Sequence, residues 1–92
     1  MIYSITYDLK KPGQDYDGLY ESIKSLGAWW HYLESTWLVD TQLNADSIYK
    51  RLDANIDKND RLLIVNFGTD YQGWLDKDAW DWIKARQILK IS

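Results

Sequence analysis

The spacing of apolar residues changes along this chain in an order that few folds can accommodate. Residues 2–9 alternate between two sets of side chains, one of them wholly apolar or aromatic, which is the pattern of a half-buried strand. Residues 16–26 carry their apolar side chains at steps of three and four instead, which forms one stripe of a helix, and Gly27 is placed to end that helix. The chain is therefore expected to begin with a strand and a helix.

The rest of the chain continues this pattern. Residues 28–41 are rich in strand-forming types around a polar Glu34-Ser35 pair, which favours a hairpin over one bent strand. Asn44 is suited to cap a second helix that runs to about Ile56. An apolar run at 61–67 predicts a fourth strand, and a third helix is expected over about 76–89.

The resulting order, βαββαβ followed by a helix, predicts an α+β ferredoxin-like fold. Its antiparallel sheet carries two helices on one face, with an extra C-terminal helix. A chain of 92 residues fits a single domain, 1–92, with a core at 1–68 and the C-terminal helix at about 76–89. The architecture leaves the second sheet face open and hosts many unrelated functions, so function has to be argued from sites.

Composition excludes several kinds of chemistry. The chain has no cysteine, which rules out disulfides, thiolate metal sites and a cysteine nucleophile. Its 14 acidic residues outnumber its 11 basic ones, and the net charge of −3 opposes a basic footprint on long nucleic acid. The sequence has neither an apolar run of the roughly 20 residues that a membrane span needs nor a secretion signal, which predicts a soluble, cytoplasmic protein with no membrane partner.

The segment after the first strand is a candidate phosphate site. It combines a carboxylate, two cations and glycine backbone near a helix start, in Asp8, Lys10, Lys11 and Gly13. We expect Lys10, Lys11 and the Gly13 backbone to hold phosphate. The equally weighted alternative is that Asp8 satisfies local backbone donors while the lysines are simply solvated.

Aromatic side chains provide the second candidate. Six Trp and seven Tyr exceed what so small a core would require. Neighbours on a strand point to opposite faces, so Trp29 or Trp30 must lie on the outer face, where it can stack on a nucleobase, pack on the last helix or meet another subunit. The candidate stacking residues are Trp29, Trp30, Tyr32 and Trp37, although rings are more often core than ligand platforms.

Metal-dependent catalysis is a further possibility. The oxygens of Asp8, Glu34 and Asp40 suit Mg²⁺ or Mn²⁺, and a dimer can bring two copies of Asp8 together across its axis. His31, the sole histidine, can act as acid or base, but a lone histidine on a strand is more often structural.

The segments MIYSITYDLKKPGQDYDGLYESIK and GAWWHYLESTWLV resemble small bacterial and phage proteins labelled SinR-like. These are similar to the CRISPR adaptation subunit and to virulence-associated protein D. The resemblance implies the ferredoxin-like fold, and at Asp8 it implies a carboxylate used in metal-dependent cleavage of RNA or DNA by a dimer. The acidic charge and the aromatic terminal helix depart from the adaptation subunit, which argues against a role in DNA integration.

Three functions follow as hypotheses. The first is a homodimeric or larger binder of a nucleotide or short RNA or DNA, working without a cofactor and sequestering a nucleotide signal in phage defence or counter-defence. The second is an endoribonuclease or nuclease dependent on Mg²⁺ or Mn²⁺, with Asp8 as metal ligand and catalytic group and His31 assisting proton transfer. The third is a protein-interaction module that uses exposed tryptophans.

Overall fold

The computed structural model describes the backbone of residues 1–10 and 16–91 and the side chains of residues 1–10, 16–31 and 33–86. The elements are β1 (Ile2–Asp8), α1 (Asp17–Lys24), β2 (Ala28–Leu33), β3 (Thr36–Asp40), α2 (Ala45–Leu52), a 3₁₀ turn (Asp53–Asn55), β4 (Arg61–Asn66) and α3 (Lys77–Ile91). The strands form one antiparallel sheet in the order β2-β3-β1-β4. The ferredoxin-like prediction is confirmed, and so is the hairpin at Glu34-Ser35.

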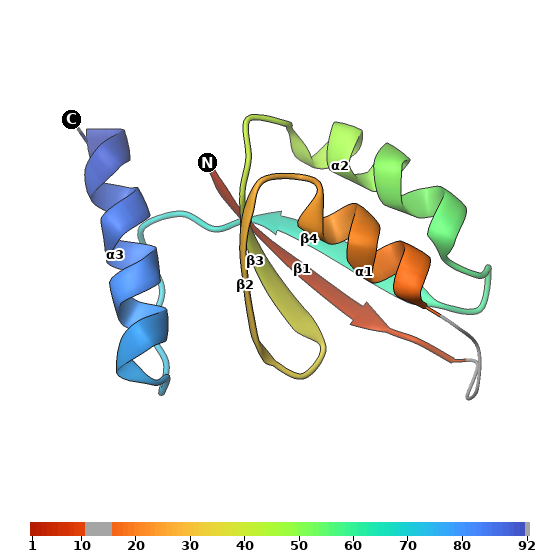
Figure 1. The fold of residues 1–92 in the computed structure, drawn as a ribbon, viewed down its shortest axis with the longest axis horizontal. Helices are drawn as coiled ribbons and strands as arrows, with labels where there is room; N and C mark the ends of the chain where they lie inside the picture. Colours follow the sequence, from red (N-terminus) through yellow and green to blue (C-terminus); the bar gives the residue numbers. More distant parts are fainter. Residues whose placement is uncertain (11–15, 92) are drawn as a thin grey trace.

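The inner face of the sheet, which we define as the face under α1 and α2 (Figure 1), carries the larger core. The alternation predicted for the first strand places Tyr3, Ile5 and Tyr7 on this face. They meet helix residues from α1 and α2 that are fully buried, namely Leu19, Ile23, Ile48 and Leu52.

The helix ends follow the predicted chemistry in part. The Asn44 side chain caps α2, because its Oδ1 accepts a hydrogen bond from the Ser47 backbone N–H at 2.8 Å. The α-helix stops at Leu52 and a 3₁₀ turn continues it to Asn55, so it ends short of Ile56, whose backbone is extended. The first helix begins at Asp17, with Tyr16 in the N-cap position.

A second, smaller core lies on the outer face, which is the opposite side of the sheet. Ile2, Trp30 and Leu38 pack there against Ala79 and Ile83 of α3. Figure 1 shows α3 beyond one end of the sheet, on the side where the N-terminus lies. The outer face is therefore covered at one end, and it stays exposed along β4, where Leu63 is 62% and Val65 47% accessible.

No helix in the part of the chain that the structure describes combines the length and the apolar character needed to cross a bilayer. The helix that comes nearest in length, α3 (Lys77–Ile91), carries several charged residues.

Candidate functional site

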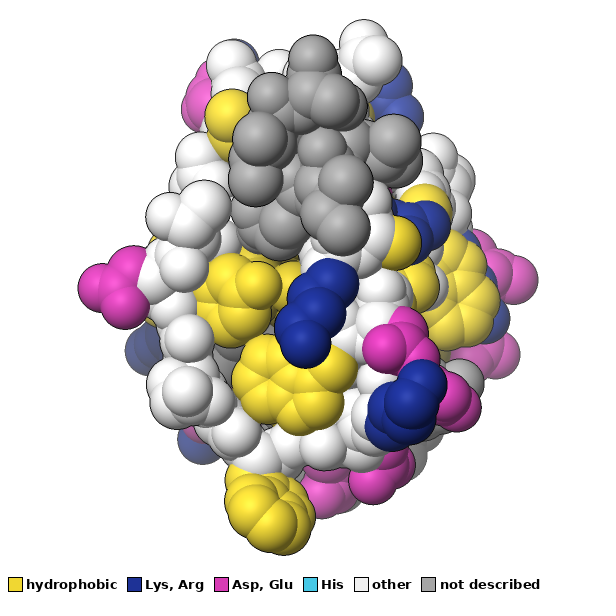
Figure 2. All heavy atoms as spheres, turned by 90° about the vertical axis from the view of Figure 1, so that its left-hand side faces the viewer, with side chains coloured by type: hydrophobic (Ala, Val, Ile, Leu, Met, Phe, Trp, Pro, Cys, Tyr) yellow, Lys and Arg dark blue, Asp and Glu magenta, His cyan; other side chains and the backbone are white. Residues whose placement is uncertain are grey.

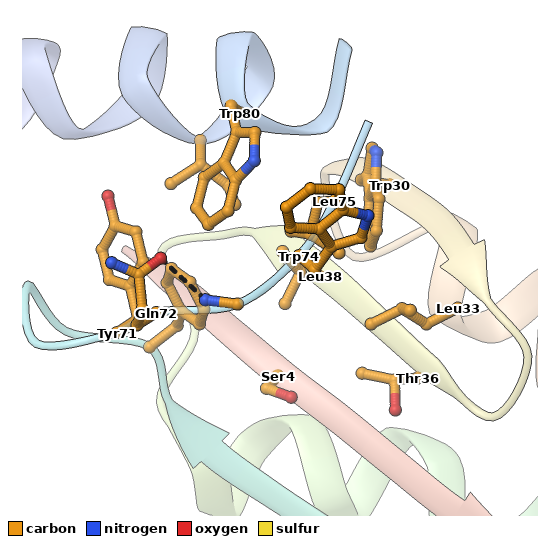
Figure 3. A pocket seen from close by; sticks show the side chains of 13 residues that line it. Ser4, Trp30, Leu33, Thr36, Leu38, Tyr71, Gln72, Trp74, Leu75 and Trp80 are labelled. Atoms are coloured by element: carbon orange, nitrogen blue, oxygen red, sulfur yellow. Dashed lines mark hydrogen bonds between the residues drawn. The ribbon is translucent and has the colours of Figure 1, made fainter. Parts of the chain in front are cut away.

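A pocket of about 340 Å³ lies on the outer face, between the sheet, the segment 67–76 and α3. Figure 3 shows side chains from all three regions pointing toward this space. The lining residues are Ser4, Trp30, Leu33, Thr36, Leu38, Phe67, Tyr71, Gln72, Gly73, Trp74, Leu75, Trp80 and Ile83.

The strands reach the pocket through an irregular β2. The pairing register between β2 and β3 shifts between Trp30 and Leu33. In a regular strand these two residues would point to opposite faces, because their positions differ by an odd number. The bulge lets both side chains line the same pocket. Regular alternation brings Ser4 from β1 and Leu38 from β3 beside them.

The segment between β4 and α3 contributes aromatic side chains that line one side of the pocket. Phe67 and Tyr71 have ring centroids 4.6 Å apart, and Tyr71 stacks on Trp80 of α3 at 6.2 Å. Trp74 also lines the pocket, yet its side chain is 99% accessible. A smaller cavity of about 130 Å³ adjoins Trp74 together with Trp30 and Leu75. Trp74 is therefore a large apolar side chain held at a pocket without being part of a core.

The polar groups of the pocket are few. Ser4 and Thr36 contribute hydroxyls and Gln72 an amide, whose Oε1 accepts a hydrogen bond from the Gly73 N–H at 2.9 Å. The lining has no charged side chain among the described residues. Ligand pockets are commonly apolar and aromatic with a few placed polar groups, and this one suits a flat, uncharged ring system.

The four predicted stacking residues do not form one site. Trp30 is buried on the outer face at the pocket, whereas Trp29 and Trp37 lie together on the inner side, with ring centroids 5.3 Å apart. The side chain of Tyr32 lies outside the described residues. The prediction that Trp29 and Trp30 face opposite sides is confirmed, with Trp30 as the outer one.

Trp37 serves the inner core. Its Nε1 donates a hydrogen bond to the Tyr7 hydroxyl at 3.1 Å, and its ring stacks on Tyr20 at 6.2 Å. Burial raises the pKa of Tyr7, although the hydrogen bond from Trp37 acts in the opposite direction. With these contacts in place, the Trp37 ring is not available as a platform for a base.

His31 is engaged in the same cluster. Its ring lies parallel to that of Trp37, with an interplanar angle of 2° and centroids 3.9 Å apart. Its Nδ1 lies 3.0 Å from the Thr36 carbonyl oxygen, which can accept a hydrogen bond from the Nδ1-H tautomer. Both contacts agree with the structural alternative for a lone strand histidine.

Asp8 and His31, the two candidate catalytic residues, are not brought together. Asp8 shares the outer-face parity of Ser4 and Thr6, while His31 stacks on a residue of the inner core. The Asp8 carboxylate is exposed and forms an ion pair with Lys10 at 2.7 Å. In the β1–β4 register Asp8 stands opposite Arg61.

The three candidate metal ligands do not lie together at one site. Asp8 and Glu34 line one shallow depression of about 260 Å³. Asp40 lies at the other end of β3, where its carboxylate contacts the N-terminal ammonium at 3.1 Å and Arg86 Nε at 3.5 Å. No group of three or more His, Asp or Glu side chains that could hold a metal ion occurs among the described residues.

Lys10, the described member of the predicted phosphate site, lies away from the ring pocket. Lys11 and Gly13 are outside the described residues. Lys10 follows the Asp8 end of β1, whereas the pocket adjoins the Ile2 half of that strand through Ser4. Figure 1 places the Asp8 end of β1 and helix α3 at opposite ends of the molecule. Lys10 and the pocket residue Trp30 are therefore not brought together in one site.

Asp60 is an important residue that was not predicted from the sequence. Its carboxylate is buried and accepts hydrogen bonds from Lys10 N–H at 2.8 Å, Asp57 N–H at 2.8 Å and the Tyr16 hydroxyl at 2.9 Å. Burial favours the neutral form, but these hydrogen bonds outweigh it, so the pKa of Asp60 lies below its ordinary value. Asp60 thereby connects the backbone that follows β1 to the start of β4 through hydrogen bonds.

The pocket residues between β4 and α3 were also not predicted from the sequence, because they lie between the expected strand at 61–67 and the expected helix at about 76–89. Tyr71 and Trp74 were the available signal, because large aromatic residues are unusual in a segment that only connects two elements.

Comparisons of this chain with protein-family models, with curated proteins and with solved structures find no match. The resemblance to the SinR-like group stays a prediction from the residues.

Proposed function

We propose that this protein binds a flat aromatic ligand, the base of a nucleotide or of a short single-stranded nucleic acid, in the outer-face pocket. The observation that carries the proposal is the set of five rings at the pocket, Trp30, Phe67, Tyr71, Trp74 and Trp80, combined with only three polar non-aromatic side chains among the described lining residues. A binder of this kind would act by sequestering its ligand.

Trp74 is the main support for a ligand role. A ring that is 99% accessible contributes little to folding, yet Trp74 is placed at the mouth of an apolar pocket. Stacking of a base on an aromatic side chain contributes about 1–3 kcal/mol and tolerates any base, since every base has a π-face. Tryptophan at this position is accounted for by contact with a ligand better than by packing.

The surroundings are compatible with a phosphate outside the pocket. The described lining has no cation, so the phosphate of a bound nucleotide would extend toward solvent. Figure 2, which views the α3 end of the molecule, shows Lys or Arg side chains beside the exposed apolar ones. Arg86 of α3 lies over the ring of Trp82, 4.1 Å from its centroid. A compact anionic ligand fits this surface better than a long polymer does, because the chain as a whole is acidic.

The test is a binding titration with nucleosides, mononucleotides, cyclic dinucleotides and short single-stranded RNA. The affinity is measured by calorimetry and by changes in the amide chemical shifts. We expect Trp74→Ala to weaken binding by about 5- to 150-fold, the equivalent of the loss of one stacked ring. Trp29→Ala is the matched control, because Trp29 is also a substantially exposed tryptophan but lies on the inner side of the sheet. Equal affinity of wild type and Trp74→Ala, or no binding at all, would overturn the proposal.

The same samples decide between binding and catalysis. Each RNA is incubated with and without Mg²⁺ and its length is measured afterwards. Shortening that requires Mg²⁺ and disappears in Asp8→Asn would establish the nuclease hypothesis instead. Intact RNA together with saturable binding at the pocket supports sequestration.

A further inference from the structure

The two edges of the sheet differ in how they resist pairing with another strand. At the β2 edge the register is interrupted by the bulge between Trp30 and Leu33. At the other edge, β4 follows β1 through six consecutive residue pairs without a shift. Natural proteins usually protect such an edge with bulges, prolines or charges. Within β4 (Arg61–Asn66, RLLIVN) the only charge is at the first residue and there is no proline.

The free edge of β4 presents a defined set of backbone groups. The Phe67 N–H donates to the Ile2 carbonyl oxygen at 2.8 Å, which continues the β1–β4 register by one pair. In an antiparallel ladder the residues alternate between those bonded to the partner strand and those facing away. Odd-numbered residues of β4 therefore bond to β1, and Leu62, Ile64 and Asn66 direct their N–H and C=O groups to the free edge. Among the described strands β4 pairs with β1 alone.

The side chains beside this edge are apolar and exposed. Leu63 and Val65 project from the outer face, where they stand opposite Thr6 and Ser4 of β1. They are 62% and 47% accessible, and they do not line the ring pocket. An exposed apolar pair beside an unprotected strand edge is the arrangement that pairs with another strand.

We propose that a second copy of this chain pairs antiparallel with β4 and joins the two sheets into one of eight strands. The outward N–H and C=O groups of Leu62, Ile64 and Asn66 determine the register of this pairing. Centring the two-fold axis on Ile64 places Ile64 opposite its own copy and Leu62 opposite Asn66, so that all the outward groups of the strand bond across the junction. On the outer face, Leu63 of each copy then lies directly opposite Val65 of the other.

Charge favours the same arrangement. The register places Arg61 of each copy opposite Phe67 of the other, so the two arginines stand at opposite ends of the junction and do not repel each other. Parallel pairing would set the two Arg61 side chains side by side instead. The antiparallel pair is thus favoured by backbone groups, apolar contacts and charges together.

Charge substitutions at the opposed pair test the interface. All the variants are compared by native mass spectrometry and sedimentation at increasing concentration, since a strand-edge contact is small and its dimer is expected to be of the weak class. In the double variant Leu63→Lys with Val65→Lys, lysine faces lysine across the junction, and we expect the dimer to be lost. In Leu63→Lys with Val65→Glu, lysine faces glutamate in this register, and we expect the dimer to persist. Both positions are exposed, so each variant should unfold at a temperature close to that of the wild type.

Leu33→Lys is the control, because Leu33 is another exposed apolar residue of the outer face but lies on the opposite edge strand. It should leave the dimer intact. A wild type that stays monomeric at the highest concentration, a dimer that survives the double-lysine change, or a dimer lost only in Leu33→Lys would each overturn the proposal.

The register is tested separately by cross-linking, for which the absence of native cysteine is an advantage. Directly opposed residues of a non-hydrogen-bonded pair have Cα atoms about 4.5 Å apart, which is within disulfide range. A mixture of Leu63→Cys and Val65→Cys chains should therefore oxidise mainly to the mixed dimer, which mass spectrometry distinguishes from the two homodimers. Preferential formation of either homodimer would contradict this register. The outcome does not depend on ligand binding, because the pocket is lined by other residues.

Discussion

The two faces of the sheet use the same kind of residue for different purposes. On the inner face, Trp37 is enclosed between His31 and Tyr20 and its Nε1 has a hydrogen-bond partner, so the ring is fixed on all sides. On the outer face, Trp30 is buried as well, but it lies at a pocket that α3 and the segment 67–76 enclose only in part. Two helices close one face, and a single helix leaves room for a ligand on the other. Whether a tryptophan is core or candidate site is decided by what covers it.

The strongest test of this contrast is Trp37→Ala on the inner face. Removing a fully packed ring leaves a cavity that the surrounding helices cannot fill, so we expect a loss of about 3–5 kcal/mol in the free energy of unfolding. Urea denaturation followed by far-UV circular dichroism measures it. A loss below about 1 kcal/mol would mean that the inner face is not the tightly packed one.

Ile83→Ala addresses the outer face. Ile83 is buried between α3 and the sheet, and shortening it should weaken the docking of α3 by about 2–4 kcal/mol. Hydrogen exchange is the measurement. Amides of α3 should lose protection while those of β1 keep it, because the inner core does not depend on this helix. Equal loss of protection in both elements would show that the two cores unfold as one unit.

Asp60→Asn tests how the stability that Asp60 provides between β1 and β4 depends on pH. The pKa of Asp60 is lower in the folded protein than its ordinary value, so the carboxylate contributes stability above that value, and this contribution is lost as the pH falls through the folded pKa. We expect a cost of about 1.5–3 kcal/mol near neutral pH, because three hydrogen bonds lose their charged acceptor.

Thermal unfolding from pH 7 down to pH 2 checks this prediction. The difference between wild type and Asp60→Asn should shrink toward the acid end. A difference that stays constant over this range would assign the acid sensitivity to other carboxylates.

Arg86→Ala is the mildest of these changes. The guanidinium lies over Trp82 at 4.1 Å and contacts the Asp40 carboxylate at 3.5 Å, in a setting that is partly open to solvent. We expect a loss of about 0.5–1 kcal/mol, visible as faster exchange in α3 and reduced by added salt. Arg86→Lys retains the charge and serves as the control. Indifference to salt would indicate that the contact with Trp82 matters more than the ion pair.

Local signals predicted most of the fold. The alternation in β1 identified which side chains share a face, and the Asn44 cap was located because an amide side chain at a helix start has a specific backbone donor to bind. The end of α2 was placed too late, since the pattern does not distinguish the last turn of an α-helix from a 3₁₀ turn.

The residues of the candidate site were harder to predict from local sequence patterns. Alternation separated Trp29 from Trp30, but it gave no information on which face the final helix would cover. Leu33 reaches the pocket only because of the bulge in β2, an irregularity that depends on how the hairpin pairs. Trp74 and Tyr71 line the pocket from a segment that has no periodicity.

The sequence by itself determined the order of strands and helices, the alternation of the strands and the exclusion of cysteine chemistry, because each of these depends on residues that are neighbours in the chain. Only the tertiary structure decided that α3 packs on the outer face, that Asp8 and His31 lie on opposite sides, and that Asp60 joins β1 to β4. These features come from contacts between segments far apart in sequence, and a local pattern holds no information about which distant surface a side chain will meet.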